Sequence, residues 1–222
     1  MDKKKWIKWI EIIVSAALLL LIVYGIYLGY GVSEDLFYDY VQEDGFVENM
    51  TALFLFFSSL VCLYRVLEYR KERKPLWLFT FGMLAVLFFF AAGEEISWGQ
   101  RIFGIESSDF FLENNKQAET NLHNLIVGGK NLNKLIFAAP MFVILTVYFL
   151  LFRILAARWT WFRNLVSRFR VPMPRNLHIW VIVISTLMVL SINLVKESEL
   201  HELSFAMVFS LIFLNPVYAE QD

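Results

Sequence analysis

Long unbroken blocks of apolar residues constrain this chain more than any other feature. The runs Ile12–Tyr30 and Leu76–Gly93 contain no charged residue, and 58% of the whole chain is hydrophobic. Apolar runs of roughly 18 residues or more match the hydrocarbon thickness of a bilayer. Because lipid offers the backbone no hydrogen-bonding partner, such runs must form helices. The sequence therefore predicts an all-α, polytopic membrane protein.

The apolar blocks predict about six transmembrane helices in a single integral membrane domain that covers residues 1–222. The last block is short for a span, so we expect it to extend into the polar segment before it, or to be tilted and covered by its neighbours. The expected spans are Trp9–Tyr30, Val47–Leu67, Leu76–Gly93, Leu135–Ala156, Leu177–Leu194 and Leu203–Tyr218.

The basic residues predict the orientation of these helices. Fifteen of the 20 lysines and arginines fall on one side of the six-span arrangement. Since loops rich in lysine and arginine stay in the cytoplasm, both termini are expected to be cytoplasmic in the inner (plasma) membrane. The stretch Arg158–Arg175, rich in arginine and tryptophan, is expected to contact anionic membrane lipids. The net charge of −1 argues against a nucleic-acid partner.

The acidic residues divide the opposite way, with 15 of the 21 on the expected outer side. Acidic residues contribute little to topology, so their concentration needs another explanation. Most belong to polar segments that directly adjoin apolar spans, and we expect these segments to converge at the outer membrane boundary. The four segments are Glu43–Asn49, Gly93–Arg101, Asn115–Asn124 and Lys196–Glu202.

The segment Gly93–Arg101 places Glu94 and Glu95 directly at the end of an apolar run. Carboxylates at that depth are costly unless they are paired, hydrated or bound to a metal. If the helix continues, Glu94, Trp98 and Arg101 lie on one face. An ion pair between Glu94 and Arg101 would then explain one carboxylate and leave Glu95 unexplained, whereas a functional site would use both.

Two histidines each follow a glutamate by four residues. Glu119 precedes His123 in a stretch expected to be a short amphipathic helix, and Glu197 precedes His201. Side chains at this spacing on a helix point in the same direction. Histidine and carboxylate ligands suit zinc, iron or manganese, although either histidine could equally be a structural residue. The sequence predicts a divalent metal, zinc foremost, held by Glu94, Glu119, His123, His201 and Glu202.

The order of these residues, a Glu-Glu…Arg segment followed by two histidines on later segments, resembles the intramembrane CAAX-protease and bacteriocin-processing (abortive-infection) family. The matching positions are Glu94, Glu95, Arg101, His123 and His201. The resemblance implies an intramembrane hydrolase. The blocks GEEISWGQR and ETNLHN also look like those of uncharacterised bacterial multi-pass membrane proteins, a likeness that brings no activity with it.

The residues and the resemblance together favour a metal-dependent membrane hydrolase. A bound metal would generate hydroxide from water, Glu95 would act as general base, and Arg101 would bind a developing oxyanion or a lipid phosphate. The substrate would be a lipid or a membrane-embedded molecule that approaches at the outer face. The alternative is a non-enzymatic transporter, accessory subunit or membrane scaffold with an acidic outer binding face.

Overall fold

The computed structural model describes residues 3–122, 124–131 and 139–219, and these are mostly helical. The chain forms α1 (Lys3–Ile26), η1 (Tyr27–Val32), α2 (Glu34–Val41), α3 (Phe46–Tyr69), α4 (Pro75–Glu95), η2 (Ser97–Gly99), α5 (Gln100–Phe103), α6 (Asp109–Asn114), β1 (Ile126–Val127), β2 (Lys130–Asn131), α7 (Ala139–Thr146), η4 (Val147–Leu151), α8 (Phe152–Arg158), α9 (Thr160–Phe169), β3 (Pro172–Met173), α10 (Asn176–Leu190), α11 (Ser198–Leu214) and β4 (Val217–Tyr218). The antiparallel pairs β1–β2 and β3–β4 are short connectors.

Four helical stretches among the described residues are long and apolar enough to cross a membrane: Lys5–Val32, Glu34–Tyr69, Pro75–Glu95 and Pro140–Arg158. Their outward surfaces are strongly apolar, with Leu20, Val86 and Ile144 exposed by 67%, 64% and 60%. In water such continuous apolar surface would favour aggregation, whereas in a bilayer it faces lipid. The chain is therefore an all-α membrane protein, as the apolar blocks predict.

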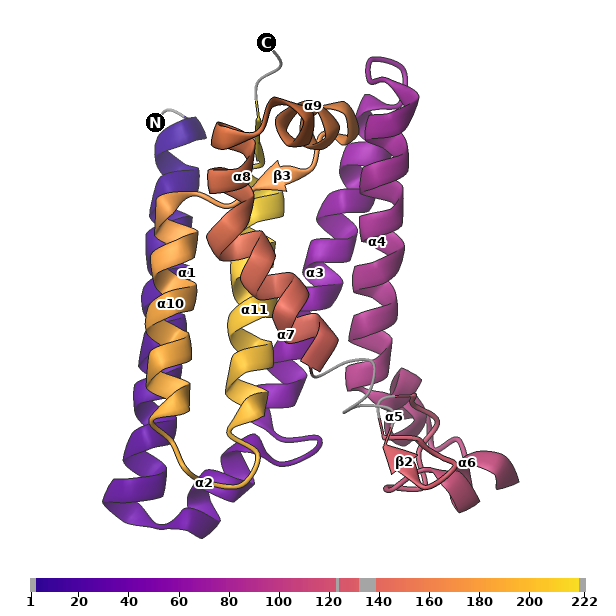
Figure 1. Cartoon of the computed structure of the whole chain (residues 1–222). Helices are drawn as coiled ribbons and strands as arrows, with labels where there is room; N and C mark the ends of the chain where they lie inside the picture. The colour runs from indigo at the N-terminus through magenta and orange to yellow at the C-terminus, as the bar shows by residue number, and fades with distance from the viewer. Residues whose placement is uncertain (1–2, 123, 132–138, 220–222) are drawn as a thin grey trace.

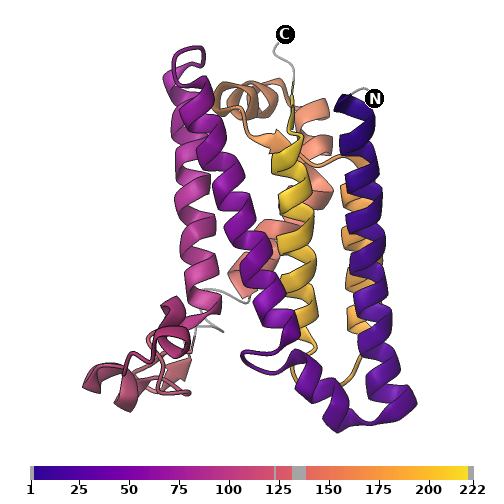
Figure 2. The same ribbon diagram turned by 180° about the vertical axis from the view of Figure 1, so that it is seen from behind.

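Helix α11 lies in the middle of the bundle, with α1 and α10 on one side and α3 and α4 on the other (Figures 1 and 2). The oblique α7 segment crosses in front of α11 in Figure 1. Residues Leu200, Leu203, Met207 and Leu211 of α11 are almost completely buried. The last expected span is thus a helix of 17 residues that begins in the polar segment, at Ser198, and is covered by its neighbours.

Neighbouring helices also terminate α11. The Arg65 guanidinium of α3 donates from Nε to the Phe213 carbonyl at 3.0 Å and from Nη2 to the Leu214 carbonyl at 2.7 Å. The last carbonyls of a helix have no partner within the helix, so this contact satisfies two of them. The helix ends at Leu214, and the expected final residues of the span form strand β4 instead.

The two ends of the bundle carry opposite charge. The beginning of α1, the α3–α4 turn, α9 and strands β3 and β4 lie at one end, which we call the basic end, whereas α2 and the η2–β2 region lie at the other, the acidic end (Figure 1). Each of the four polar segments expected to converge contacts at least two of the others at the acidic end. The η2–β2 region, residues 97–122 and 124–131, extends sideways from that end, and we call it the side lobe.

Candidate functional site

The polar segments Gly93–Arg101 and Asn115–Asn124 are joined by hydrogen bonds at the junction of α4 and the side lobe. The Ser97 hydroxyl donates to Glu119 Oε2 at 2.5 Å and accepts from Asn121 Nδ2 at 2.9 Å. The backbone N–H of Leu122 donates to Glu94 Oε2 at 2.6 Å. The carboxylates of Glu94 and Glu119 are both buried, so these hydrogen bonds offset part of the cost of removing them from water.

Helix α4 ends at Glu95, so the condition under which Glu94, Trp98 and Arg101 would share one helical face is not met. Ser97 and Trp98 have φ values of +46° and +56°, in the left-handed region that non-glycine residues rarely adopt, and the chain turns sharply there. The turn folds the Trp98 ring back onto Gly93, where an added Cβ would meet the ring at 2.8 Å. Trp98 Nε1–H donates to Glu94 Oε1 at 2.9 Å, and this contact helps to hold the strained turn.

The expected amphipathic helix around Glu119 is wrong. Residues 116–122 form turns and bends, because Asn115 directs the backbone away from a helix. The Asn115 Oδ1 atom accepts from the backbone N–H groups of Gln117 at 2.9 Å and Glu119 at 3.3 Å. Its Nδ2 donates to both oxygen atoms of Asn121, one backbone and one side-chain. His123 lies outside the described residues, so its position relative to Glu119 stays a prediction.

Arg101 forms ion pairs with Asp44 and Glu119. Asp44 belongs to the turn before α3, so Arg101 connects the side lobe to the helical bundle. The oxygens of Glu94, the ion-pair partner considered in the sequence, accept from Trp98 and Leu122. The Arg101 side chain remains 45% exposed, so a guanidinium edge faces solvent beside the buried Glu119 carboxylate.

Glu95 belongs to a different cluster from its neighbour Glu94. The Glu95 and Glu202 carboxyl groups, from α4 and α11, lie within hydrogen-bonding reach of one another. Glu199 of α11 and Glu48 of α3 act on the same Glu95 group through their charge. We call Glu43, Glu48, Glu95, Glu199 and Glu202 the carboxylate cluster. The α2–α3 turn, the first turns of α3 and α11 and the last turn of α4 bring it together at the acidic end.

Lys196 brings a positive charge to the carboxylate cluster and forms an ion pair with Glu43. Glu43 also accepts a hydrogen bond from Gln117 of the side lobe. Glu48 is buried and accepts from the backbone N–H of Asp44. The cluster therefore connects the α2–α3 turn, α11 and the side lobe. Lys196 cannot neutralise all the carboxyl groups of the cluster, because they outnumber it.

The pKa values of the two carboxyl groups that precede the apolar part of α11 are raised. Burial, followed by the negative charges of Glu202 and Glu43, raises the pKa of Glu199 to about 9. Burial by the surrounding helices, followed by the negative charge of Glu43, raises the pKa of Glu202, although part of its surface still contacts solvent. The hydrogen bond with Glu95 acts in the opposite direction but does not cancel this effect. Both shifts favour bound protons at the acidic end.

The expected metal ligands fall into separate environments. His201 donates a ring N–H to the Thr186 carbonyl of α10, and its Nε2 is buried without a hydrogen-bond partner among the described residues. Its neighbour Glu202 faces Glu95 instead, because consecutive helical residues diverge by about 100°. Glu94 and Glu119 belong to the side-lobe network. Within residues 3–122, 124–131 and 139–219, no three His, Cys, Asp or Glu side chains gather as a metal site.

The sequence did not reveal that Glu43 and Glu199 belong to the carboxylate cluster, or that Lys196 pairs with Glu43. All three residues lie in two of the four polar segments expected to converge. The signal that could have found them is the adjacency of these segments to the starts of α3 and α11. Comparison of the chain with models of protein families, with curated proteins and with solved structures finds no match. The function must therefore be argued from the site itself.

Proposed function

We propose that this protein spans the inner (plasma) membrane six times with both termini in the cytoplasm, and that its carboxylate cluster binds a cation at the outer face. The observation that carries the proposal is the contact between Glu95 and Glu202 across two apolar helices, with Glu48 and Glu199 beside them. The opposite charge of the two ends of the bundle supports the orientation.

Two carboxylates within hydrogen-bonding reach cannot both be ionised without a compensating charge. They must share a proton or bind a cation between them. Carboxylate oxygens without nitrogen or sulfur ligands suit hard cations such as Ca²⁺, Mg²⁺ and Mn²⁺. We infer that the Glu95–Glu202 pair exchanges a proton against a divalent cation. No three carboxylates of the described residues gather as a ready metal site, so cation binding would have to draw Glu48 or Glu199 closer to this pair. This chemistry belongs to a transporter, an accessory subunit or a scaffold whose outer face is regulated by a cation.

A metal-dependent hydrolase is the second candidate, and the adjacency of His201 and Glu202 on one helical turn favours it. In that case His201 would turn from Thr186 and join Glu202, with His123 completing a zinc site. Glu95 would then act as general base, and the exposed edge of Arg101 would face a lipid or membrane-embedded substrate. The first candidate needs no such rearrangement of His201, which is why the geometry supports it better.

Cation titration of the purified, chelator-treated protein in detergent tests the proposal. Isothermal calorimetry with Ca²⁺, Mg²⁺, Mn²⁺ and Zn²⁺ should detect one site. Glu95→Gln and Glu202→Gln should each weaken binding by more than about tenfold, because each removes a ligand. Glu113→Gln is the matched control, since Glu113 is an exposed acid of α6 at the same end.

His201→Asn separates the two candidates. Cation binding that survives in this variant supports the carboxylate cluster, whereas loss of zinc binding in His201→Asn, with chelator-sensitive hydrolysis of a lipid by the wild-type protein, supports the hydrolase. Equal affinity in wild-type, Glu95→Gln and Glu202→Gln proteins would refute both.

A further inference from the structure

The side lobe is polar inside and apolar outside. Its buried side chains form hydrogen bonds within the lobe, and among its described residues Leu125 is the one large apolar side chain that is buried. The buried polar residues are Ser97, Ser107, Asn115, Glu119, Asn121 and Asn124. Large apolar side chains are instead exposed by 50–74%, at Ile102, Phe103, Ile105, Phe110, Leu112 and Val127. Because a domain in water buries such side chains, the surface of the side lobe is suited to an apolar partner.

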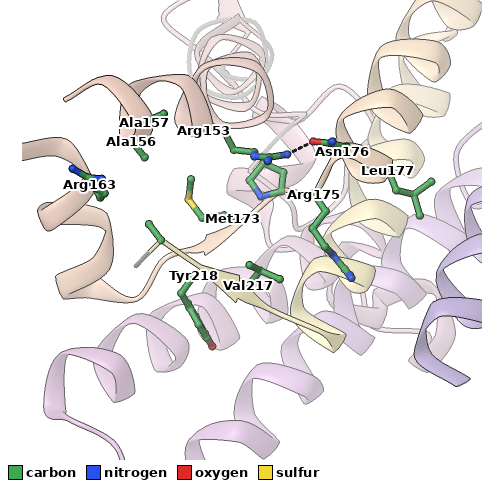
Figure 3. Close-up of a pocket in the computed structure, with 12 residues that line it drawn as sticks. Arg153, Ala156, Ala157, Arg163, Met173, Arg175, Asn176, Leu177, Val217 and Tyr218 are labelled. Carbon is green, nitrogen blue, oxygen red and sulfur yellow. Dashed lines mark hydrogen bonds between the residues drawn. The ribbon is translucent and has the colours of Figure 1, made fainter. Parts of the chain in front are cut away.

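The basic end of the bundle has a different surface. A pocket of about 720 Å³ lies there, surrounded by α8, α9, the start of α10 and strands β3 and β4 (Figure 3). Arg153 in its lining donates to the Asn176 side chain, and Arg175 pairs with the buried Glu11 of α1. These guanidinium groups already have partners within the chain, whereas the exposed apolar side chains of the side lobe need a partner outside it.

The apolar surface of the side lobe continues the lipid-facing surface of α4. The Trp98 ring packs against Phe89 and Phe90, with ring centroids 6.2 Å and 5.4 Å apart. Phe89 and Phe90 belong to the membrane-spanning helix α4 and are 51% and 36% exposed. The lobe extends from the end of α4 away from α1 and α10, and so lies beside the bundle at the acidic end (Figures 1 and 2). The lipid leaflet that surrounds this end of α4 therefore borders the lobe.

Acidic residues of the side lobe limit how deeply it can enter the leaflet. Glu106, Asp109 and Glu113 are exposed and lie next to exposed apolar residues in the sequence. A charge in the hydrocarbon centre is costly, so these carboxylates must reach water. Amphipathic segments solve this conflict at the membrane boundary, where their apolar side enters the leaflet by about 5–10 Å. Tryptophan, as at Trp98, is enriched at the same depth.

We propose that the side lobe inserts Ile102, Phe103, Ile105 and Phe110 into the lipid leaflet at the acidic end of the bundle. Its partner is the acyl-chain region of the bilayer. Arg101 pairs with Asp44, so the inserted lobe would hold the α2–α3 turn at the membrane boundary. The proposal does not depend on cation binding by the carboxylate cluster, because it rests on the polarity of the lobe and its contact with α4.

Spin labels on the full chain, reconstituted in phosphatidylcholine vesicles, test the proposal. Cys62 is the one cysteine of the chain, so Cys62→Ser gives a background for single labels at Ile102→Cys on α5 and Phe110→Cys on α6. Electron paramagnetic resonance measures collisions of each label with oxygen, which concentrates in lipid, and with a nickel chelate, which stays in water. Val86→Cys, on the lipid-facing surface of α4, and Glu72→Cys, in the exposed α3–α4 turn, are the lipid and water controls.

The ratio of oxygen to nickel collisions at Ile102 and Phe110 should be close to that at Val86 and several times that at Glu72. Nickel collisions as frequent as at Glu72 would place the lobe in water and overturn the proposal. Loss of collisions with both reagents would show a protein cover and would also overturn it. In the purified protein that cover is a second copy, which dilution with unlabelled chains identifies through reduced spin–spin broadening.

A folding check keeps the test valid if a label disturbs the side lobe. The backbone N–H of Leu122 donates to the Glu94 carboxylate, so its hydrogen exchange reports whether the lobe remains attached to α4. Labelled variants should protect this amide as well as the wild-type protein does. Ile105→Cys, at another exposed apolar residue of the lobe, replaces a variant that fails this check.

Discussion

Replacing Arg101 with alanine should release the side lobe from the bundle. The substitution removes two ion pairs of different value. The pair with Asp44 joins two side chains that are each nearly half exposed, and such pairs contribute at most about 1 kcal/mol. The pair with Glu119 matters more, because the Glu119 side chain is only 8% exposed and its Oε1 has no hydrogen bond from another described residue to replace the guanidinium.

The magnitude follows from that asymmetry. Removing one partner of a fully buried pair costs about 3–5 kcal/mol, and a single hydrogen bond to a charged group contributes about 1.5–3 kcal/mol. Arg101 is 45% exposed, so water can reach part of the space it leaves, and the lower range applies. We expect Arg101→Ala to destabilise the side lobe by about 2–3 kcal/mol. This corresponds to an opening equilibrium increased by roughly 30- to 150-fold.

Hydrogen exchange of the side-lobe amides measures this opening. The backbone N–H groups of Leu122 and Thr120, which donate to Glu94 and Gln100, should exchange faster in Arg101→Ala by that factor. Asp44→Ala should accelerate exchange less than about fivefold. The double variant Arg101→Ala/Glu119→Gln should recover part of the protection, because it removes the uncompensated charge. Unchanged exchange in Arg101→Ala, or an equal effect of Asp44→Ala, would refute this reasoning.

Three further predictions address the strained turn, the carboxylate cluster and the topology. Trp98→Phe keeps the ring over Gly93 but removes the N–H donor to Glu94, so it should reduce stability by about 1–2 kcal/mol in chemical unfolding, and no change would contradict the assigned contact. The pKa of Glu199 is raised from 4.5 to about 9, so its stabilising contribution is complete below pH 4.5 and is lost as the pH rises toward 9. The unfolding temperature of the wild-type protein should therefore fall more between pH 5 and pH 9 than that of Glu199→Gln, and parallel curves would refute the shift. Reporter domains fused after Gly31, Asn131 or Lys196 should give an exterior signal, and a cytoplasmic signal from any of these fusions would contradict the six-span topology.

The positions of the expected spans could be predicted because each helix must satisfy its own backbone in lipid. The apolar blocks at Val47–Leu67 and Leu76–Gly93 correspond to α3 and α4 within two residues at each end. The α10 helix ends four residues before Leu194, since the Ser191 hydroxyl and N–H bind carbonyls of the preceding turn. Local chemistry of this kind shifts an element boundary without changing the element.

The candidate site was predictable as a region and not as an arrangement. Segments that directly adjoin spans are expected at the membrane boundary, so topology predicts that the four polar segments converge. The ion pairs Arg101–Asp44, Arg101–Glu119 and Lys196–Glu43 confirm that these segments contact one another. Spacing within one segment could not reveal that Ser97 and Trp98 leave the helical conformation, because their φ values depend on a tryptophan that packs on Gly93 and on a partner loop. Residues 116–122 are not helical for the same reason, since the side chain of Asn115 competes for the backbone. The i, i+4 pairing of Glu119 with His123 stays a prediction, because His123 lies outside the described residues.

The sequence by itself determined that this protein is helical, that it belongs in a membrane and that its charges divide between two ends, because these properties depend on apolar run length and on the cost of placing charge in lipid. Only the tertiary structure decided which carboxylates meet. Adjacent residues of one helix point in different directions, so Glu94 joins the side-lobe network while Glu95 faces Glu202, and His201 faces α10 while Glu202 does not. Such partnerships depend on how α3, α4 and α11 pack against one another, and the packing is set by side chains that lie far apart along the chain.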